Sequence, residues 1–378
     1  MSTLVHSIRL LGSASIESDR RDAWALFDDG RVAATGTGGA LPHADESVDG
    51  GGGCLVPGFI DIHGHGGGGA SFDNGPDAIA TARAIHRAHG TTRAVLSLIT
   101  APIDVLAARV SMVADLCDAD PTILGSHLEG PFLDPAHKGA HTESLLRAPD
   151  AASVDRLIEA GRGTIRQVTL APERPGAFEA IQRFVEAGVK VAVGHTDADA
   201  ETTRRAFDAG ATLLTHAFNA MPPIHHRAPG PVVPALRDDR VTLEVIADGV
   251  HVDVELIATL FAVAGHRIAL ITDAMAAAGS QDGRYDLGGL AVNVTDGVAR
   301  LEQGGAIAGS TLTQDAALRH VASAGVPLDV VAHALGAQPA HAIGRDDLGH
   351  LDIGALADAV LLDHDLTVRR VWVAGRDA

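Results

Sequence analysis

Aromatic residues are scarce in this sequence: nine Phe, two Trp and one Tyr make up 3% of 378 residues. Stacking of sugar rings on aromatic faces needs more of them, so a lectin-like binding surface is excluded. There are two cysteines, Cys54 and Cys117, which cannot form a disulfide framework. This low cysteine usage predicts a reducing compartment.

Basic residues are also few, with 29 Lys and Arg against 48 Asp and Glu, which gives a formal net charge of −19. Nucleic acids and anionic membranes select basic surfaces, so neither is expected as a partner. No apolar run approaches the roughly 20 residues of a membrane-spanning helix. The first 22 residues lack the basic start and long apolar run of a signal peptide. These features predict a cytoplasmic protein.

Apolar residues are plentiful, at 46% of the chain, and in the middle of the sequence they form eight strand-like runs. Amphipathic helical segments separate most of these runs, and the alternation predicts a parallel (β/α)8 TIM-like barrel. A doubly wound open sheet is the rival, but HGHGGGGAS after the first run does not fit a dinucleotide-binding fingerprint. The runs are residues 58–63, 94–100, 122–129, 165–173, 189–195, 211–216, 241–248 and 267–273.

Both ends of the chain have a different, strand-rich pattern. Residues 4–16 form one strand-like run, and Asp29-Gly30 suits the turn of a hairpin that follows it. Short strands return after residue 353. The sequence therefore predicts a small β-sandwich domain from residues 1–56 and 349–378, and a barrel domain over residues 57–348. A further hairpin is expected around Asp296-Gly297, after the eighth run.

Metal-binding residue types end several of the barrel runs. In a barrel, the carboxyl ends of the strands meet at one mouth, where active sites are built. Imidazole and carboxylate groups are the usual ligands of Zn²⁺ and similar ions. A single His at such a place is usually a hydrogen-bonding residue, but six metal-capable residues together favour a metal site. They are His63, His65, Glu129, His195, His216 and Asp273.

Seven motifs in a fixed order, and the closing GHLDIGALADAVLLD, resemble the N-acetylglucosamine-6-phosphate deacetylases of the amidohydrolase superfamily. The resemblance covers nearly the whole chain. It implies hydrolysis of the N-acetyl group of N-acetylglucosamine 6-phosphate to glucosamine 6-phosphate and acetate, in amino-sugar catabolism and cell-wall recycling. It also implies a homodimer. The motifs are PGFIDIHGHGGGG, HLEGPF, VAVGHTDA, THAFNAMPP, ADGVHVD, ITDAMAAAG and IAGSTLT.

The resemblance implies one or two divalent ions per subunit, with Zn²⁺ as the first choice and Fe, Mn or Co as alternatives. Glu129, His195 and His216 would hold the main ion, and His63 and His65 a second one. Asp273 would be a ligand and the catalytic acid and base. The fourth run has no Lys that could bridge two ions, so Glu129 would have to bridge them.

The resemblance also assigns the substrate contacts. His141 would donate a hydrogen bond to the acyl oxygen, and Arg227 and His251 would bind the phosphate, with Arg227 reaching across a dimer interface. A solvated loop position is the alternative for His141 and for Arg227. His225 and His226 receive no role. The remaining predicted substrate contacts are Ala140, Asn219, Ala220, Ile307, Ala308 and Gly309.

Two other functions remain open at this stage. One is another amidohydrolase, such as a cyclic amidase, which would usually carry a bridging Lys, or a D-aminoacylase. The other is a non-catalytic barrel scaffold. Such scaffolds tend to lose their metal ligands, whereas all six positions are filled here.

Overall fold

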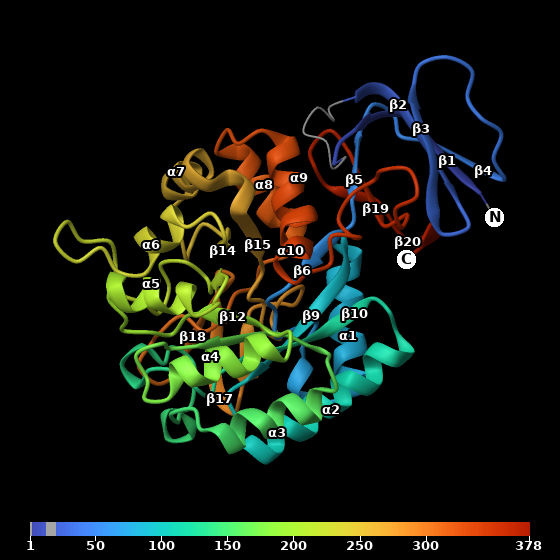
Figure 1. The fold of residues 1–378 in the computed structure, drawn as a ribbon. Helices are drawn as coiled ribbons and strands as arrows, with labels where there is room; N and C mark the ends of the chain where they lie inside the picture. Colours follow the sequence, from blue (N-terminus) through green and yellow to red (C-terminus); the bar gives the residue numbers. More distant parts are fainter. Residues whose placement is uncertain (1, 13–19) are drawn as a thin grey trace.

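A parallel barrel forms the centre of the molecule, whose computed structural model describes residues 2–12 and 20–378. Its eight strands run in sequential order around the barrel, each parallel to the next, and helices surround them (Figure 1). The predicted (β/α)8 architecture is confirmed. The strands are β6 (Phe59–Asp61), β9 (Thr91–Ile99), β10 (Ile123–Glu129), β11 (Ile165–Leu170), β12 (Lys190–Val193), β13 (Leu213–Leu214), β14 (Thr242–Ile246) and β15 (Ile268–Ile271).

The helices follow the amphipathic segments of the sequence. In the first helix, Pro76 occupies the first turn, where its missing N–H would have had no partner within the helix. His86 and Arg87 occupy the last turn, where a positive charge interacts favourably with the helix dipole. The helices are α1 (Pro76–Ala88), α2 (Ile103–Ala119), α3 (Ala151–Gly161), α4 (Ala177–Glu186), α5 (Ala200–Asp208), α6 (Val232–Arg237), α7 (Val254–Ala264), α8 (Gln314–Ser323), α9 (Leu328–Leu335) and α10 (Ala337–Ala342).

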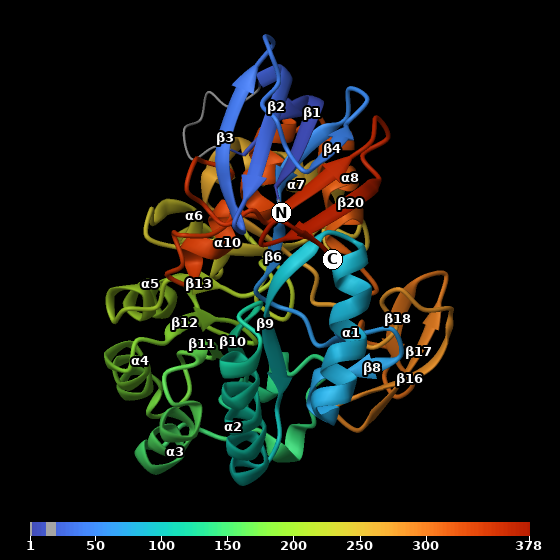
Figure 2. The same cartoon turned by 90° about the vertical axis from the view of Figure 1, so that its right-hand side faces the viewer.

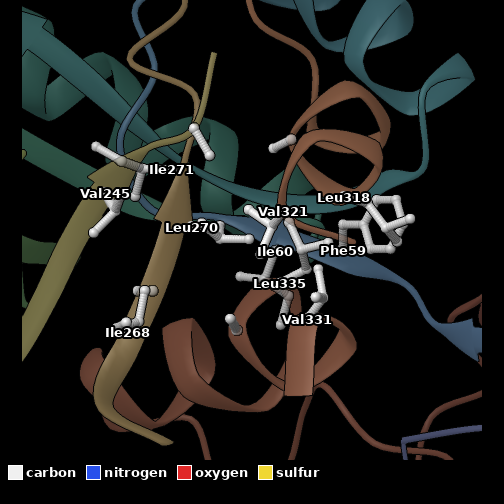
Figure 3. Close-up of a cluster of buried hydrophobic side chains, with 14 of the residues drawn as sticks. Phe59, Ile60, Val245, Ile268, Leu270, Ile271, Leu318, Val321, Val331 and Leu335 are labelled. Atoms are coloured by element: carbon white, nitrogen blue, oxygen red, sulfur yellow. The ribbon is translucent and has the colours of Figure 1, made fainter. Parts of the chain in front are cut away.

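Hydrophobic side chains fill the space between the barrel wall and its outer helices. Figure 3 shows one such cluster, in which β14, β15 and the start of β6 face helices α8 and α9. The packing holds the strands, and therefore their carboxyl ends, in fixed positions. The labelled members are Phe59, Ile60, Val245, Ile268, Leu270, Ile271, Leu318, Val321, Val331 and Leu335.

Strands from both ends of the chain join in one eight-stranded sheet beside the barrel (Figure 1). This sheet has its own buried core, which includes Phe27 and Trp372 with ring centroids 5.8 Å apart. The part of the first predicted run from residue 13 lies outside the described residues. The strands are β1 (Thr3–Leu10), β2 (Arg20–Asp28), β3 (Arg31–Thr37), β4 (Glu46–Asp49), β5 (Cys54–Pro57), β19 (Ala359–Leu362), β20 (Val368–Val373) and β21 (Arg376–Asp377).

A three-stranded antiparallel sheet follows the last barrel strand. It consists of β16 (Gly283–Leu287), β17 (Leu290–Thr295) and β18 (Val298–Leu301), and lies near α1 on one side of the barrel (Figure 2). The turn between β17 and β18 is the expected one at Asp296-Gly297. A two-stranded ribbon, β7 (Gly66–Gly67) and β8 (Ala70–Ser71), follows the first barrel strand.

Among the described residues, every helix is too short or too polar to cross a lipid bilayer.

Candidate active site

The six predicted metal-binding residues come together at the carboxyl ends of the barrel strands. All six are buried. His195, His216 and Asp273 each follow their strand by two residues and adopt a left-handed backbone, with φ of 47°, 26° and 48°. Such conformations are strained for residues other than glycine and are concentrated at functional sites.

Three ligand atoms form a compact triangle. The Glu129 Oε1 atom lies 3.1 Å from His195 Nε2 and 3.3 Å from His216 Nε2, and the two nitrogens are 3.1 Å apart. A tetrahedral Zn²⁺ ion with bonds of about 2.0–2.1 Å would hold its ligand atoms about 3.3 Å from one another. The triangle therefore has the dimensions of one face of a metal coordination shell.

A second set of atoms surrounds the other side of Glu129. His65 Nε2 lies 3.1 Å from Glu129 Oε2 and 3.3 Å from Asp273 Oδ1. His63 Nε2 lies 3.4 Å from Glu129 Oε1 and 3.6 Å from the same Asp273 oxygen. His63 Nε2 is buried without a hydrogen-bond partner, although it faces two carboxylates. This nitrogen could bind a cation placed between it and the two carboxylates. Glu129 lies between the two sets of atoms, with the triangle on one side and the His63 and His65 nitrogens on the other.

The ionisation of the carboxylates also suits a cation site. Burial raises the pKa of Glu129, but the charge of His63 and the hydrogen bond from His195 help to outweigh it and hold that pKa well below its usual value. Burial likewise opposes ionisation of Asp273, and His63 and His65 bring its pKa below the usual value. Both groups are therefore carboxylates at neutral pH and can act as anionic ligands or proton acceptors.

His141 faces the same cluster from the loop after β10. Its Nε2 atom is 3.4 Å from Glu129 Oε2, and its Nδ1 atom is 2.9 Å from the Thr100 hydroxyl. Burial and the neighbouring histidines lower the pKa of His141 to about 4 although Glu129 opposes them, so its ring is neutral at pH 7. The Thr100 hydroxyl donates its single proton to the Glu129 carbonyl, so His141 Nδ1 must be the donor in its bond to Thr100. In this tautomer Nε2 carries a lone pair that points into the site.

A cavity of about 350 Å³ opens above these residues. Most of the predicted substrate contacts line it: Ala140, His141, Asn219, Ala220, His251, Ile307 and Gly309. Ala308 is instead fully buried in a hydrophobic cluster with Met275 and Leu287.

His251 brings a positive charge to the cavity wall. Its Nδ1 atom is 2.7 Å from Asp248 Oδ2. Burial lowers the pKa of His251, but the Asp248 carboxylate outweighs burial and raises it above the usual value. The imidazolium form is therefore more stable than in a free histidine, and this form can bind an anion.

Arg227 is not part of this cavity within its own chain. It lies in the exposed loop between β13 and α6, which projects from the body of the molecule (Figure 1). Its Nη1 atom is 2.6 Å from His226 Nε2, and the rings of His225 and His226 have centroids 4.2 Å apart.

Three further residues, His127, Glu244 and Thr100, contact the site and were not predicted from the sequence. His127 lies on β10 beneath His63, with ring centroids 4.5 Å apart, and bonds Ser97 and Thr169. Glu244 on β14 contacts His63 and Gln167 on β11. Thr100 follows β9. The sequence does carry a signal for His127, Gln167 and Glu244. Each is a polar residue within an apolar strand-like run (SHLE, RQVT and TLEV), and a buried polar residue needs a partner.

Comparisons with known proteins agree with this arrangement. Residues 54–377 match the model of the amidohydrolase family. The chain is 42% identical to an N-acetylgalactosamine-6-phosphate deacetylase of Escherichia coli O157:H7, over 85% of this chain and 87% of the relative. It is 36% identical to an N-acetylglucosamine-6-phosphate deacetylase of Vibrio furnissii, over 85% and 82%.

A solved structure from Mycobacterium smegmatis has the same fold. It is a mutant N-acetyl-D-glucosamine-6-phosphate deacetylase in complex with N-acetyl-D-glucosamine-6-phosphate. Its sequence is 44% identical, the match covers 100% of this chain and 98% of that one, and the TM-score is 0.94.

Proposed function

The chain belongs to the amidohydrolase family, and from this premise we propose that it hydrolyses the N-acetyl group of N-acetylglucosamine 6-phosphate. The products are glucosamine 6-phosphate and acetate. The observation that carries the proposal is the cluster of six residues with metal-capable side chains at the floor of a cavity whose wall holds His251, a histidine with a raised pKa. The names of relatives at 36% and 44% identity, which specify this substrate, support it.

The reaction requires a divalent cation, for which we propose Zn²⁺. Glu129, His195 and His216 would hold it, since their ligand atoms already lie 3.1–3.3 Å apart. His63 and His65, with Glu129 and Asp273, would hold a second ion. When bound, such a cation lowers the pKa of the attacking water and withdraws electron density from the acyl oxygen.

Asp273 moves the proton in the proposed mechanism. Its carboxylate takes a proton from the water as the water oxygen bonds to the acyl carbon. The protonated Asp273 then gives this proton to the amide nitrogen, the C–N bond breaks, and the sugar leaves as an amine. The same proton is taken up and returned, so the side chain regains its starting form.

His141 would stabilise the charge that develops on the acyl oxygen. For Nε2 to donate to that oxygen, the Thr100 hydroxyl must turn so that it donates to His141 Nδ1, which moves the ring proton to Nε2. Alternatively, a ring that keeps the present tautomer would serve as a metal ligand. The backbone around Ile307 and Gly309 would lie along the sugar.

His251 and the backbone at Asn219 and Ala220 would bind the 6-phosphate. Arg227 would add a second cation from the partner subunit of a homodimer, which fits its position on a projecting loop outside its own cavity. We also place the enzyme in the cytoplasm, because two cysteines are too few for a disulfide framework.

The C4 epimer, N-acetylgalactosamine 6-phosphate, is a second candidate substrate because a relative named for it is 42% identical. A cyclic amidase is less favoured, since no Lys lies on β11 (Ile165–Leu170). Acetate release should be measured with both sugar phosphates, unphosphorylated N-acetylglucosamine and an N-acetyl-D-amino acid, and ring opening should be measured with dihydroorotate. The proposal fails if the last two are hydrolysed and the sugar phosphates are not.

A further inference from the structure

Glu244 is a buried carboxylate at the heart of the barrel that the proposed reaction does not use. Its side chain is fully buried. It lies on β14, two residues before Ile246, which lines the active-site cavity, so Glu244 points to the barrel interior beneath that cavity. A buried charge is costly unless it has partners, so the partners of Glu244 indicate its role.

Both oxygens of Glu244 are engaged with other strands. Oε2 lies 3.0 Å from His63 Nδ1, just beyond β6. Oε1 accepts a hydrogen bond of 2.6 Å from Gln167 Nε2 on β11. Gln167 is itself fully buried. The carboxylate therefore connects three separate strands and is fixed in orientation at both oxygens.

This contact determines the tautomer of His63. A carboxylate can only accept a hydrogen bond, so His63 Nδ1 carries a proton, and in the neutral ring that binds a cation the lone pair is on Nε2. Nε2 is the buried atom without a partner that faces Glu129 and Asp273 at 3.4 and 3.6 Å. Glu244 thus prepares His63 to bind a cation through Nε2.

The other histidines of the cluster lack such a carboxylate behind the ring. His195 Nδ1 bonds the backbone oxygen of His137 at 2.8 Å. Among residues 2–12 and 20–378, the Nδ1 atoms of His65 and His216 find no hydrogen-bond partner, and both atoms are buried. A carboxylate behind a metal-binding imidazole orients the ring and makes it a stronger ligand. His63 is the ring that receives this support.

We propose that Glu244, held by Gln167, is a positioning residue that makes His63 a ligand of a second divalent cation, on the His63–His65 side of Glu129. The inference rests on the proposed metal-dependent function.

The test measures metal affinity rather than activity. Metal-free wild-type protein and Glu244→Gln are titrated with Zn²⁺ in competition with a chromophoric chelator, and bound metal is counted by mass spectrometry. The amide keeps the size of the side chain but not its charge. The same titration of His63→Ala identifies the second ion, because the binding step of that ion is missing in this variant.

We expect Glu244→Gln to weaken that step by about 10- to 100-fold, as is usual for residues that support a metal ligand. The step assigned to Glu129, His195 and His216 should remain unchanged. In the His63→Ala background, Glu244→Gln should have no further effect, because the two changes remove the same interaction.

Asp315→Asn is the matched control. Asp315 is also a buried carboxylate 3.0 Å from a histidine Nδ1, that of His89, and it lies on α8 outside the site. Its variant should bind both ions normally. If Glu244→Gln does not fold, Gln167→Met replaces it and should weaken the same ion by a smaller factor.

Three results would overturn the inference: a wild-type protein that binds a single ion, a variant with unchanged affinity for both ions, or an equal loss of both. Failure of the proposed function would look different. Two ions with this dependence on Glu244, but no acetate released from the sugar phosphate, would refute the substrate and leave the role of Glu244 intact.

Discussion

Asp273 is fixed in place by its backbone as well as by its charge. Its N–H donates to the His63 carbonyl at 2.8 Å, and its own carbonyl accepts from Ser310 N at 2.7 Å. The lowered pKa keeps the side chain ready to accept a proton at neutral pH. Geometry and ionisation both suit a general base that works beside the cation.

We predict that Asp273→Asn lowers kcat by about 10²–10⁴, the usual contribution of a general acid or base. The amide has nearly the same shape but does not take the proton from water. Bound metal, counted in the same preparation, should largely remain because Glu129, His195 and His216 are intact. A variant with normal kcat would rule out the proton-transfer role.

His251 and Asp248 form a pair whose effect depends on pH. In the wild type, Asp248 raises the pKa of His251, so the imidazolium persists above the ordinary pKa of about 6.5. In Asp248→Asn, burial acts without this opposition and lowers the pKa. The positive charge is then lost as the pH rises through neutrality, while in acid both proteins carry it.

We therefore predict that Asp248→Asn loses up to about 10- to 150-fold in kcat/KM for the phosphorylated sugar at pH values between the lowered pKa of the variant and the raised pKa of the wild type, which corresponds to one charged hydrogen bond of about 1.5–3 kcal/mol. At pH values below both pKa values the loss should be small. The phosphate of the substrate also titrates in this range, and dividing kcat/KM of the variant by kcat/KM of the wild type at each pH removes that common effect. A ratio that stays constant with pH would contradict the role of the pair.

At the scale of elements, the carboxyl ends of five barrel strands each deliver part of the site. The triangle of His195, His216 and Glu129 comes from the ends of β12, β13 and β10. The segment after β6 adds His63 and His65, and the segment after β15 adds Asp273. Because the strands are packed against the outer helices, these groups are held close together before any ion binds.

The two halves of the cluster should respond differently to mutation. His195→Ala should remove most bound metal and activity, because it breaks the compact triangle. The double variant His63→Ala, His65→Ala should remove only the second, weaker metal equivalent. Metal counts at graded free Zn²⁺ test this. Full metal and turnover in the His195 variant would show that the triangle is not the main site.

Most elements of the barrel were predictable because their patterns are local. All eight runs became strands, and the turn at Asp296-Gly297 joins two strands as expected. Glycine favours the left-handed backbone of such turns, and Gly297 has φ of 73°. Strand order in a barrel also follows the sequence, which is why the strand-end residues could be grouped in advance.

The interior of the barrel was less predictable. Glu244, Gln167 and His127 lie within strands, and their partners come from strands that are distant in sequence. Sequence alone shows that a polar residue interrupts an apolar run, but it does not show which residue lies across the barrel. The separation of Ala308 from its neighbours Ile307 and Gly309 depends in the same way on local backbone direction.

At the scale of the whole molecule, the two side chains proposed to bind the phosphate lie in different places. His251 is in the wall, whereas Arg227 is exposed between β13 and α6. A homodimer in which each loop reaches the partner's cavity would complete the phosphate site. Such a site is shared between subunits, so it can be tested by mixing variants.

We predict that mixing Arg227→Ala and Asp273→Asn proteins under exchange conditions restores activity that neither has alone. In the mixed dimer, one site has an intact Asp273 and receives an intact Arg227 from the partner, so about a quarter of all sites should recover. Arg227→Ala alone should impair the phosphorylated sugar and spare the plain sugar. If mixing restores nothing, Arg227 does not act across the interface.

The central claim is that the metal cluster hydrolyses the amide of a phosphorylated amino sugar. The most direct measurement is acetate release from N-acetylglucosamine 6-phosphate by the purified protein, before chelation, after chelation, and after Zn²⁺ is restored. The account predicts rapid release, its loss on chelation and its recovery with Zn²⁺. No release by the metal-loaded protein, or release that is unaffected when metal analysis shows the ions removed, would contradict it.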